Sequence, residues 1–147
     1  MTTPTRPQDG SCSALHDPLA QNEAHALASA TNILEYEAAW RRAYPSAALG
    51  GIGAAEVRRV AHAHTAELSG CYEAALAKVE QAAGRVVVRF VIDPQGGVPA
   101  AHLAKDELGV AGVGCCLVQR VAAWKFPAPE GGGYAVVEYP FTVRIRH

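Results

Sequence analysis

The chain has 147 residues and a mass of 15.4 kDa, which leaves room for one domain with a modest core and an extension. Hydrophobic residues make up 50% and charged residues 18% of the sequence, a composition that excludes an intrinsically disordered chain. The 13 basic and 14 acidic side chains nearly cancel, and no basic run exceeds Arg41–Arg42 or Arg58–Arg59, so we expect no nucleic-acid partner.

The first third of the chain predicts a tail, a helix and a linker. Residues 1–17 show little periodicity, so we expect a mobile tail. Residues 18–44 carry apolar side chains at helical spacing, with Asp17 as the expected N-cap and Pro45 as the stop, which predicts an amphipathic helix. The small residues of 45–54 indicate a linker before the main domain.

The main domain, residues 55–147, begins with a helix and then changes period. Residues 55–81 carry an apolar stripe at helical spacing, which predicts a second helix. In RVVVRFVI, residues 85–92, the side chains alternate with a period of two, as in a strand. The turn sequence DPQGG and the weaker strand VPAAHLA then complete a hairpin.

A third helix and a long last strand complete the predicted order. Apolar residues at helical spacing predict a helix over 110–124, whose end we expect Trp124 and Phe126 to close in the core. Residues 134–146 alternate again, and Pro140 within them cannot donate to a ladder, which argues for a sheet edge. We therefore expect an α+β fold, α-β-β-α-β, with a three-stranded antiparallel or mixed sheet.

The four cysteines allow several interpretations. The chain has no C-x-x-C, which removes the usual thioredoxin and zinc-ribbon signals. The adjacent pair Cys115–Cys116 could act in redox chemistry, bind a metal or only pack, although neighbours on a helix point about 100° apart and a bond between them would be strained. One structural disulfide with two spare thiols fits the count as well.

Catalytic and cofactor motifs are missing from the sequence. No H-E-x-x-H or G-x-S-x-G occurs, and His64 lies on the apolar stripe of residues 55–81, as a packed histidine would. The glycines of 131–133 follow a helix and precede a strand, the reverse of the order in phosphate-binding loops. We expect no enzyme activity, no cofactor and no metal. Asp106 follows a strand, and we expect it to cap the third helix.

The succession of CYEAAL, GRVVVRFVIDPQGGV, CLVQRVAAWKFPAPEGGG and VVEYPFTV resembles the TonB C-terminal domain superfamily. It is most similar to the AgmX/PglI-type C-terminal domain of myxobacterial motility and envelope proteins, over residues 55–145. The resemblance implies two helices on one face of a three-stranded sheet and a protein-binding adaptor without enzyme activity. In TonB, the exposed C-terminal strand accepts a short peptide by strand addition.

Applied to this sequence, the resemblance implies two sets of functional residues. The two cysteines of the family pattern match Cys71 and Cys116, which implies a disulfide between the first and second helices of the domain. The strand that accepts a peptide matches residues 134–145. The partner-binding residues expected on its outward face are Tyr134, Val136, Glu138, Thr142 and Arg144. The alternative for this face is an ordinary solvated edge, protected against aggregation by its charges and Pro140.

The chain departs from TonB in two ways. These 147 residues show neither a membrane anchor nor a long proline-rich spacer, and they add the helix 18–44, so we do not expect the energy-coupling role of TonB. A second hypothesis follows from that helix: the chain is a structural or assembly subunit that oligomerises or docks through an exposed Ile33, Leu34 and Trp40 stripe.

The compartment is left open by the sequence. No apolar run approaches the roughly 18 residues of a membrane span, so we expect no direct membrane insertion. The N-terminus lacks the apolar segment of a secretory signal, which points to the cytoplasm if the chain is full length. The resemblance points instead to the periplasm or cell envelope.

Overall fold

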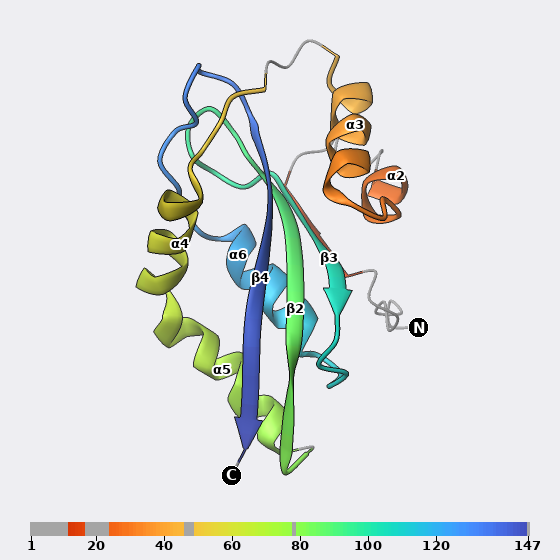
Figure 1. Ribbon diagram of the computed structural model, residues 1–147, viewed down its shortest axis with the longest axis vertical. Coiled ribbons are helices and arrows are strands. Elements are labelled where there is room, and N and C mark those ends of the chain that lie inside the picture. The colour runs from red at the N-terminus through yellow and green to blue at the C-terminus, as the bar shows by residue number, and fades with distance from the viewer. Residues whose placement is uncertain (1–11, 17–23, 46–48, 78, 147) are drawn as a thin grey trace, which may run out of the picture.

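The computed structural model describes residues 12–16, 24–45, 49–77 and 79–146. The expected N-cap Asp17 and the tail before Cys12 lie outside these ranges. The elements along the chain are β1 (Ser13–Leu15), α2 (Ala24–Ala28), α3 (Ile33–Ala43), α4 (Ala54–Ala63), α5 (Thr65–Leu76), β2 (Gln81–Ile92), β3 (Ala100–Asp106), α6 (Val113–Ala122) and β4 (Ala135–Arg146) (Figure 1). None of the helices in these ranges is long and apolar enough to cross a membrane.

The fold is α+β; the described residues form five helices and a four-stranded antiparallel sheet in the order β1-β3-β2-β4. The prediction of three strands was therefore wrong. The fourth strand, β1, pairs with β3 through Ser13 opposite His102 and Leu15 opposite Ala100. A three-residue strand is too short to show an alternating pattern, and β1 lies where the sequence indicated only a tail.

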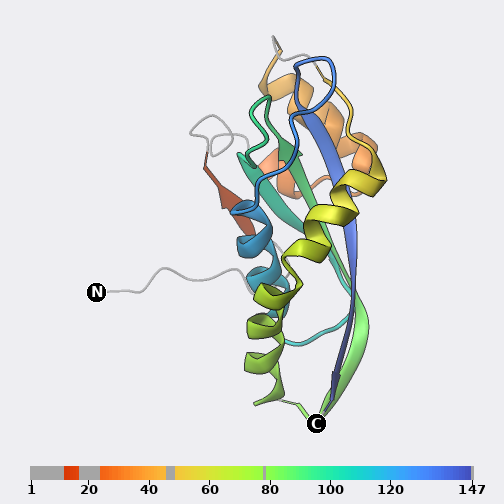
Figure 2. The ribbon, with the colours of Figure 1, turned by 90° about the vertical axis from the view of Figure 1, so that its left-hand side faces the viewer.

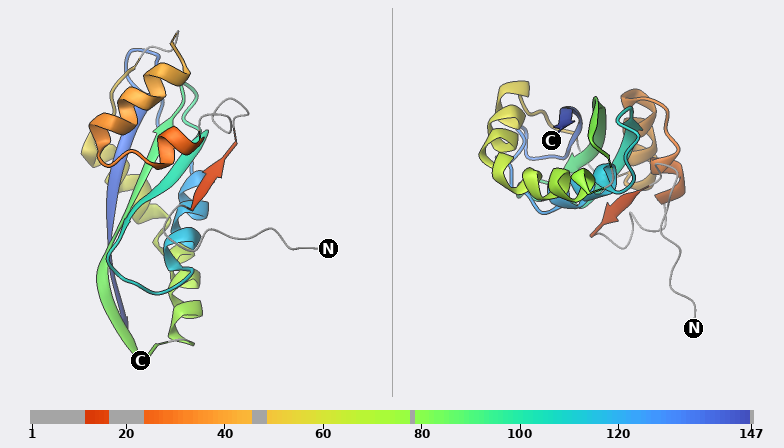
Figure 3. Two further views of the ribbon diagram at one scale, coloured as in Figure 1. Left: turned by 90° about the vertical axis from the view of Figure 1, so that its right-hand side faces the viewer. Right: turned by 90° about the horizontal axis from the view of Figure 1, so that it is seen from below.

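Helices cover both faces of the sheet. Figures 2 and 3 show α4, α5 and α6 on one face, here called the inner face, and α2 and α3 on the other, the outer face. The inner cluster includes Val86, Val88, Phe90 and Ile92 of β2, whereas the outer cluster includes Val91, whose side chain points the other way. The resemblance implied helices on one face only. The second layer comes from the N-terminal helices that it does not cover.

Both long predicted helices are interrupted within the described residues. The segment 18–44 contains α2 and α3, and Asn32 caps α3 by accepting a hydrogen bond from the Glu35 N–H at 2.9 Å. The segment 55–81 contains α4 and α5, which break at His64, and its last residue already belongs to β2. The apolar stripe continues through both breaks because the paired helices pack on the same face of the sheet.

The third helix packs as expected but is shorter than predicted. Leu117 and Val121 of α6 are fully buried in the inner cluster, and Trp124 and Phe126 are buried just beyond its end. Asp106 does not cap α6, whose N-cap is Gly112. Its carboxylate instead accepts hydrogen bonds from two N–H groups of the loop that follows β3. Sequence spacing alone does not distinguish such a local turn from a helix N-cap.

Candidate functional site

Strand β4 forms one edge of the sheet. It pairs antiparallel with β2 along its whole length, from Ala135 opposite Ile92 to Arg146 opposite Gln81. In the part of the chain that the structure describes, no other strand pairs with it. Half of the backbone polar groups of β4 therefore point away from the sheet.

The direction of these groups follows from one hydrogen bond. The N–H of Gly50 donates to the carbonyl of Tyr134 at 2.6 Å, from the side opposite β2. In an antiparallel strand, the N–H and C=O of a residue point to the same side, and the side alternates along the chain. The even-numbered residues of β4 therefore point their backbone groups outward, and Pro140, which has no N–H, falls in this outward set.

This position explains how a proline is accommodated in the strand. Because Pro140 points outward, β4 keeps every hydrogen bond to β2 and lacks only one donor on its free edge. The outward donors that remain before the last residue of the strand are the N–H groups of Val136, Glu138, Thr142 and Arg144. Among the described residues, none of these four donates to another backbone or side-chain group.

The first position of the edge is already occupied. Leu49 forms a parallel bridge with Tyr134, and Gly51 forms an antiparallel bridge with Glu130. The chain then leaves the edge and enters α4. The open part of the edge therefore starts at Val136.

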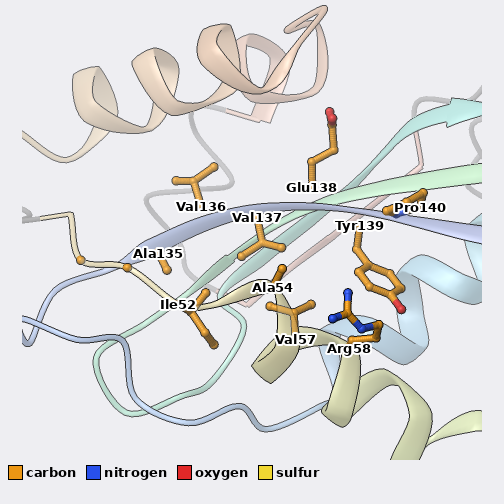
Figure 4. A pocket seen from close by; sticks show the side chains of 12 residues that line it. Ile52, Ala54, Val57, Arg58, Ala135, Val136, Val137, Glu138, Tyr139 and Pro140 are labelled. Atoms are coloured by element: carbon orange, nitrogen blue, oxygen red, sulfur yellow. The ribbon is translucent and has the colours of Figure 1, made fainter.

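A groove of about 560 Å³ runs beside this open edge, between β4 and the start of α4. Figure 4 shows Ala135, Val137 and Tyr139 pointing toward Ile52, Val57 and Arg58, while Val136 and Glu138 point to the other face. We call this hollow the edge groove. Its lining residues are Gly50, Gly51, Ile52, Ala54, Val57, Arg58 and residues 135–140.

The α4 side of the edge groove was not foreseen from the sequence. Ile52 and Val57 are more than 75 positions before β4 in the chain, and only the packing of α4 on the inner face brings them beside it. Their apolar character is also what a core helix requires. The sequence therefore gave no signal that separates a lining residue from a core residue.

The five partner-binding residues expected on the last strand lie in three different environments, and Tyr134 itself lies just before β4. Tyr134 packs against Trp40, with ring centroids 5.5 Å apart, and Val136 is half-buried beneath the same helix, α3. Glu138 forms an ion pair with Arg89. Thr142 and Arg144 are exposed on the outer face, beyond the part that α2 and α3 cover.

Arg89 joins the edge strand to the N-terminal helices. Its side chain is buried, and its Nε donates to Glu138 Oε2 at 2.6 Å. Its two terminal nitrogens donate to the carbonyls of Ala30 and Thr31, at 2.6 and 2.9 Å. Every nitrogen of the guanidinium is thus used, which offsets the cost of burying the charge.

A buried histidine lies next to Arg89 in the same layer. His102 of β3 is opposite Arg89 in the sheet, is only 2% exposed, and its Nδ1 lies 2.7 Å from the Tyr36 hydroxyl. Burial, and secondarily the charge of Arg89, lowers the pKa of His102 to about 4. Burial also raises the pKa of the Tyr36 hydroxyl, so both groups are neutral at pH 7.

The cysteines form one structural bond. A disulfide joins Cys71 of α5 to Cys116 of α6, with the Cα atoms 5.7 Å apart, as the resemblance implied. Cys12 is buried and Cys115 is partly exposed, and neither is in a disulfide. Within the described ranges, no three histidine, cysteine or acidic side chains lie close enough together to bind a metal ion.

His64, which the apolar stripe predicted to be packed, stacks on Trp124 with ring centroids 4.8 Å apart. Its Nδ1 also contacts the carboxylate of Glu67, and this contact is the main reason that the pKa of Glu67 is lowered. The environment of His64 is that of a packing residue at the α4–α5 break.

A scan against protein-family models, a search of curated proteins and a search of solved structures found no match to this chain.

Proposed function

We propose that the protein is a non-enzymatic adaptor that binds an extended segment of a partner protein by strand addition at β4. The observation that supports the proposal is the row of outward N–H groups at Val136, Glu138, Thr142 and Arg144, of which those of Val136 and Glu138 lie beside the edge groove. Backbone hydrogen bonds along such an edge give affinity, and pockets for alternate side chains give selectivity. The resemblance of residues 55–145 to TonB C-terminal domains supports the same function.

The geometry defines how the partner would lie. A strand added to β4 pairs with the even-numbered residues and points every second side chain into the edge groove, toward Ile52 and Val57. At Pro140, the added strand can pair with the backbone carbonyl but meets no N–H donor. The segment Leu49–Gly51 stops the added strand at the Val136 end.

The proposal is tested with Thr142→Pro, which removes a second outward donor and leaves the bonds to β2 in place. Thr142→Val is the matched control, because it keeps the N–H and nearly the same shape. Peptides are first selected on the wild-type protein from a random ten-residue phage-displayed library, and their affinities for the variants are then measured by fluorescence polarisation.

We expect Thr142→Pro to weaken peptide affinity at least about tenfold, because it removes about one hydrogen bond and its ring adds a steric effect. We expect Thr142→Val to change the affinity less than about twofold. If Thr142→Pro leaves every selected peptide bound, or if selection yields no binder, strand addition at β4 is wrong.

A further inference from the structure

The α2–α3 layer is attached to the sheet by a cluster of its own. This outer cluster is separate from the inner cluster that α4, α5 and α6 form on the opposite face. Its buried members are Leu27, Tyr36, Ala39, Trp40, Val91 and Ala100. Figures 1 and 3 show that α2 and α3 lie over one end of the sheet only. The layer could therefore leave the sheet without disturbing the inner cluster.

Polar groups buried beneath this layer are incompletely paired. Among the described residues, neither Nε2 of His102 nor Nε1 of Trp40 has a hydrogen-bond partner, although both side chains are almost fully buried. Each unpaired buried group weakens the attachment of the layer. Among the described residues, the bonds across it join His102 to Tyr36 and Arg89 to the two carbonyls at the turn between α2 and α3.

The surroundings of His102 cannot accept a second positive charge. From α3 it meets the neutral Tyr36 hydroxyl, from β2 the Arg89 guanidinium, and from β1 it is opposite Ser13 in the sheet. Two carboxylates on elements around it are engaged elsewhere: Glu138 of β4 binds Arg89, and Glu35 of α3 accepts from the Thr31 N–H. An imidazolium here would lie buried beside a cation, with no counter-ion supplied by the described residues.

We propose that the α2–α3 layer is an acid-released cover, which stays on the outer face at neutral pH and detaches as a unit when His102 takes up a proton. Detachment gives the imidazolium access to water and exposes the apolar surface of Val91 and Ala100. The inner cluster and the disulfide keep the rest of the domain folded. This proposal does not depend on peptide binding at β4.

The sign of the effect follows from proton linkage. The covered state holds His102 neutral, with a pKa of about 4, whereas the open state has a pKa near the ordinary 6.5. The stabilisation from the neutral ring is complete above about pH 6.5 and is lost as the pH falls toward 4. From these values, the equilibrium constant for opening should rise about 30-fold between pH 7.5 and pH 5.

Hydrogen exchange followed by mass spectrometry measures this opening on the intact chain. Exchange of α3 and of α6 is compared at pH 7.5 and pH 5, after correction for the intrinsic dependence of exchange on pH. We expect the opening constant of α3 to rise about 30-fold and that of α6 to change less than about threefold. Equal loss of protection in the two helices, or unchanged protection of α3, would overturn the proposal.

Two variants identify the titrating group. His102→Gln cannot be protonated and should abolish the pH dependence of α3 exchange, whereas His64→Gln, at the α4–α5 break, should retain it. If His102→Gln does not fold, His102→Asn decides, because it also lacks a titrating side chain and should also abolish the pH dependence of α3 exchange. An approximately 30-fold response, the size expected from linkage, that persists in either variant contradicts the assignment.

Discussion

Arg89 shows how one side chain can connect three parts of the fold. It belongs to β2, binds Glu138 on β4 and holds the carbonyls of Ala30 and Thr31 at the turn between α2 and α3. A lysine ammonium also has three donors, but all three lie on one nitrogen, whereas these three acceptors are reached by three separate nitrogens of the planar guanidinium. The three contacts therefore require an arginine at this position, with its side chain on the outer face.

Replacing Arg89 by Met should lower the free energy of unfolding by roughly 3 kcal/mol, because it leaves a partly buried carboxylate and two carbonyls without their donor. Urea denaturation of the purified variant measures the loss. As a control, Arg59→Met removes an exposed ion pair with Glu56 and should cost less than about 0.5 kcal/mol. A loss equal to that of the control would show that the Arg89 contacts contribute little.

The disulfide between α5 and α6 is the covalent link among the elements. It closes a loop of 45 residues, for which chain entropy gives about 4 kcal/mol of stabilisation. Replacing both Cys71 and Cys116 by Ala should lower the free energy of unfolding by a similar amount. Wild-type protein in reductant should match the double variant, and Cys115→Ala should retain the wild-type value. If reductant leaves the free energy of unfolding of the wild-type protein unchanged, the disulfide does not stabilise the fold as expected.

Much of the main domain could be predicted from periodicity. The alternation of residues 85–92 and 134–146 predicted two strands, and Pro140 predicted that the second forms an edge; the structure confirms both. The breaks at Asn32 and His64 were missed because consecutive helices that pack on the same face continue one apolar stripe. Strand β1 was missed because three residues carry no detectable period.

Of the candidate site, the sequence predicted the β4 side but not the α4 side. The edge strand was found, but the edge groove depends on Ile52 and Val57, which tertiary packing alone brings to β4. The buried His102–Tyr36 contact was missed for a related reason. From the sequence, both residues look like members of an exposed face. They are buried only because a second layer of helices covers the sheet, and their local sequence does not indicate that layer.

At the scale of the whole molecule, the apolar stripe of the N-terminal helices is largely buried within the same chain. Trp40 is fully buried against the sheet and Ile33 is partly buried, so Leu34 is left exposed at 73%. A single exposed leucine does not form a docking patch. This arrangement removes the main reason for expecting assembly through that stripe.

We therefore expect a monomer of 15.4 kDa at micromolar concentration, and no change of mass in Leu34→Glu. Size-exclusion chromatography with light scattering at neutral pH measures both. A stable dimer that Leu34→Glu dissociates would instead support the hypothesis of a structural or assembly subunit.

The pairing of β2 with β4 also has a consequence for synthesis on the ribosome. β2 is one of the two inner strands, and its neighbour on one side is β4, which begins more than 50 positions after the first residue of β2. Until residue 146 has left the exit tunnel, the hydrogen-bonding edge of β2 is open and the inner cluster lacks Phe141 and Val143. Until then the nascent chain carries an unpaired apolar strand, a state that is prone to aggregation and accessible to chaperones.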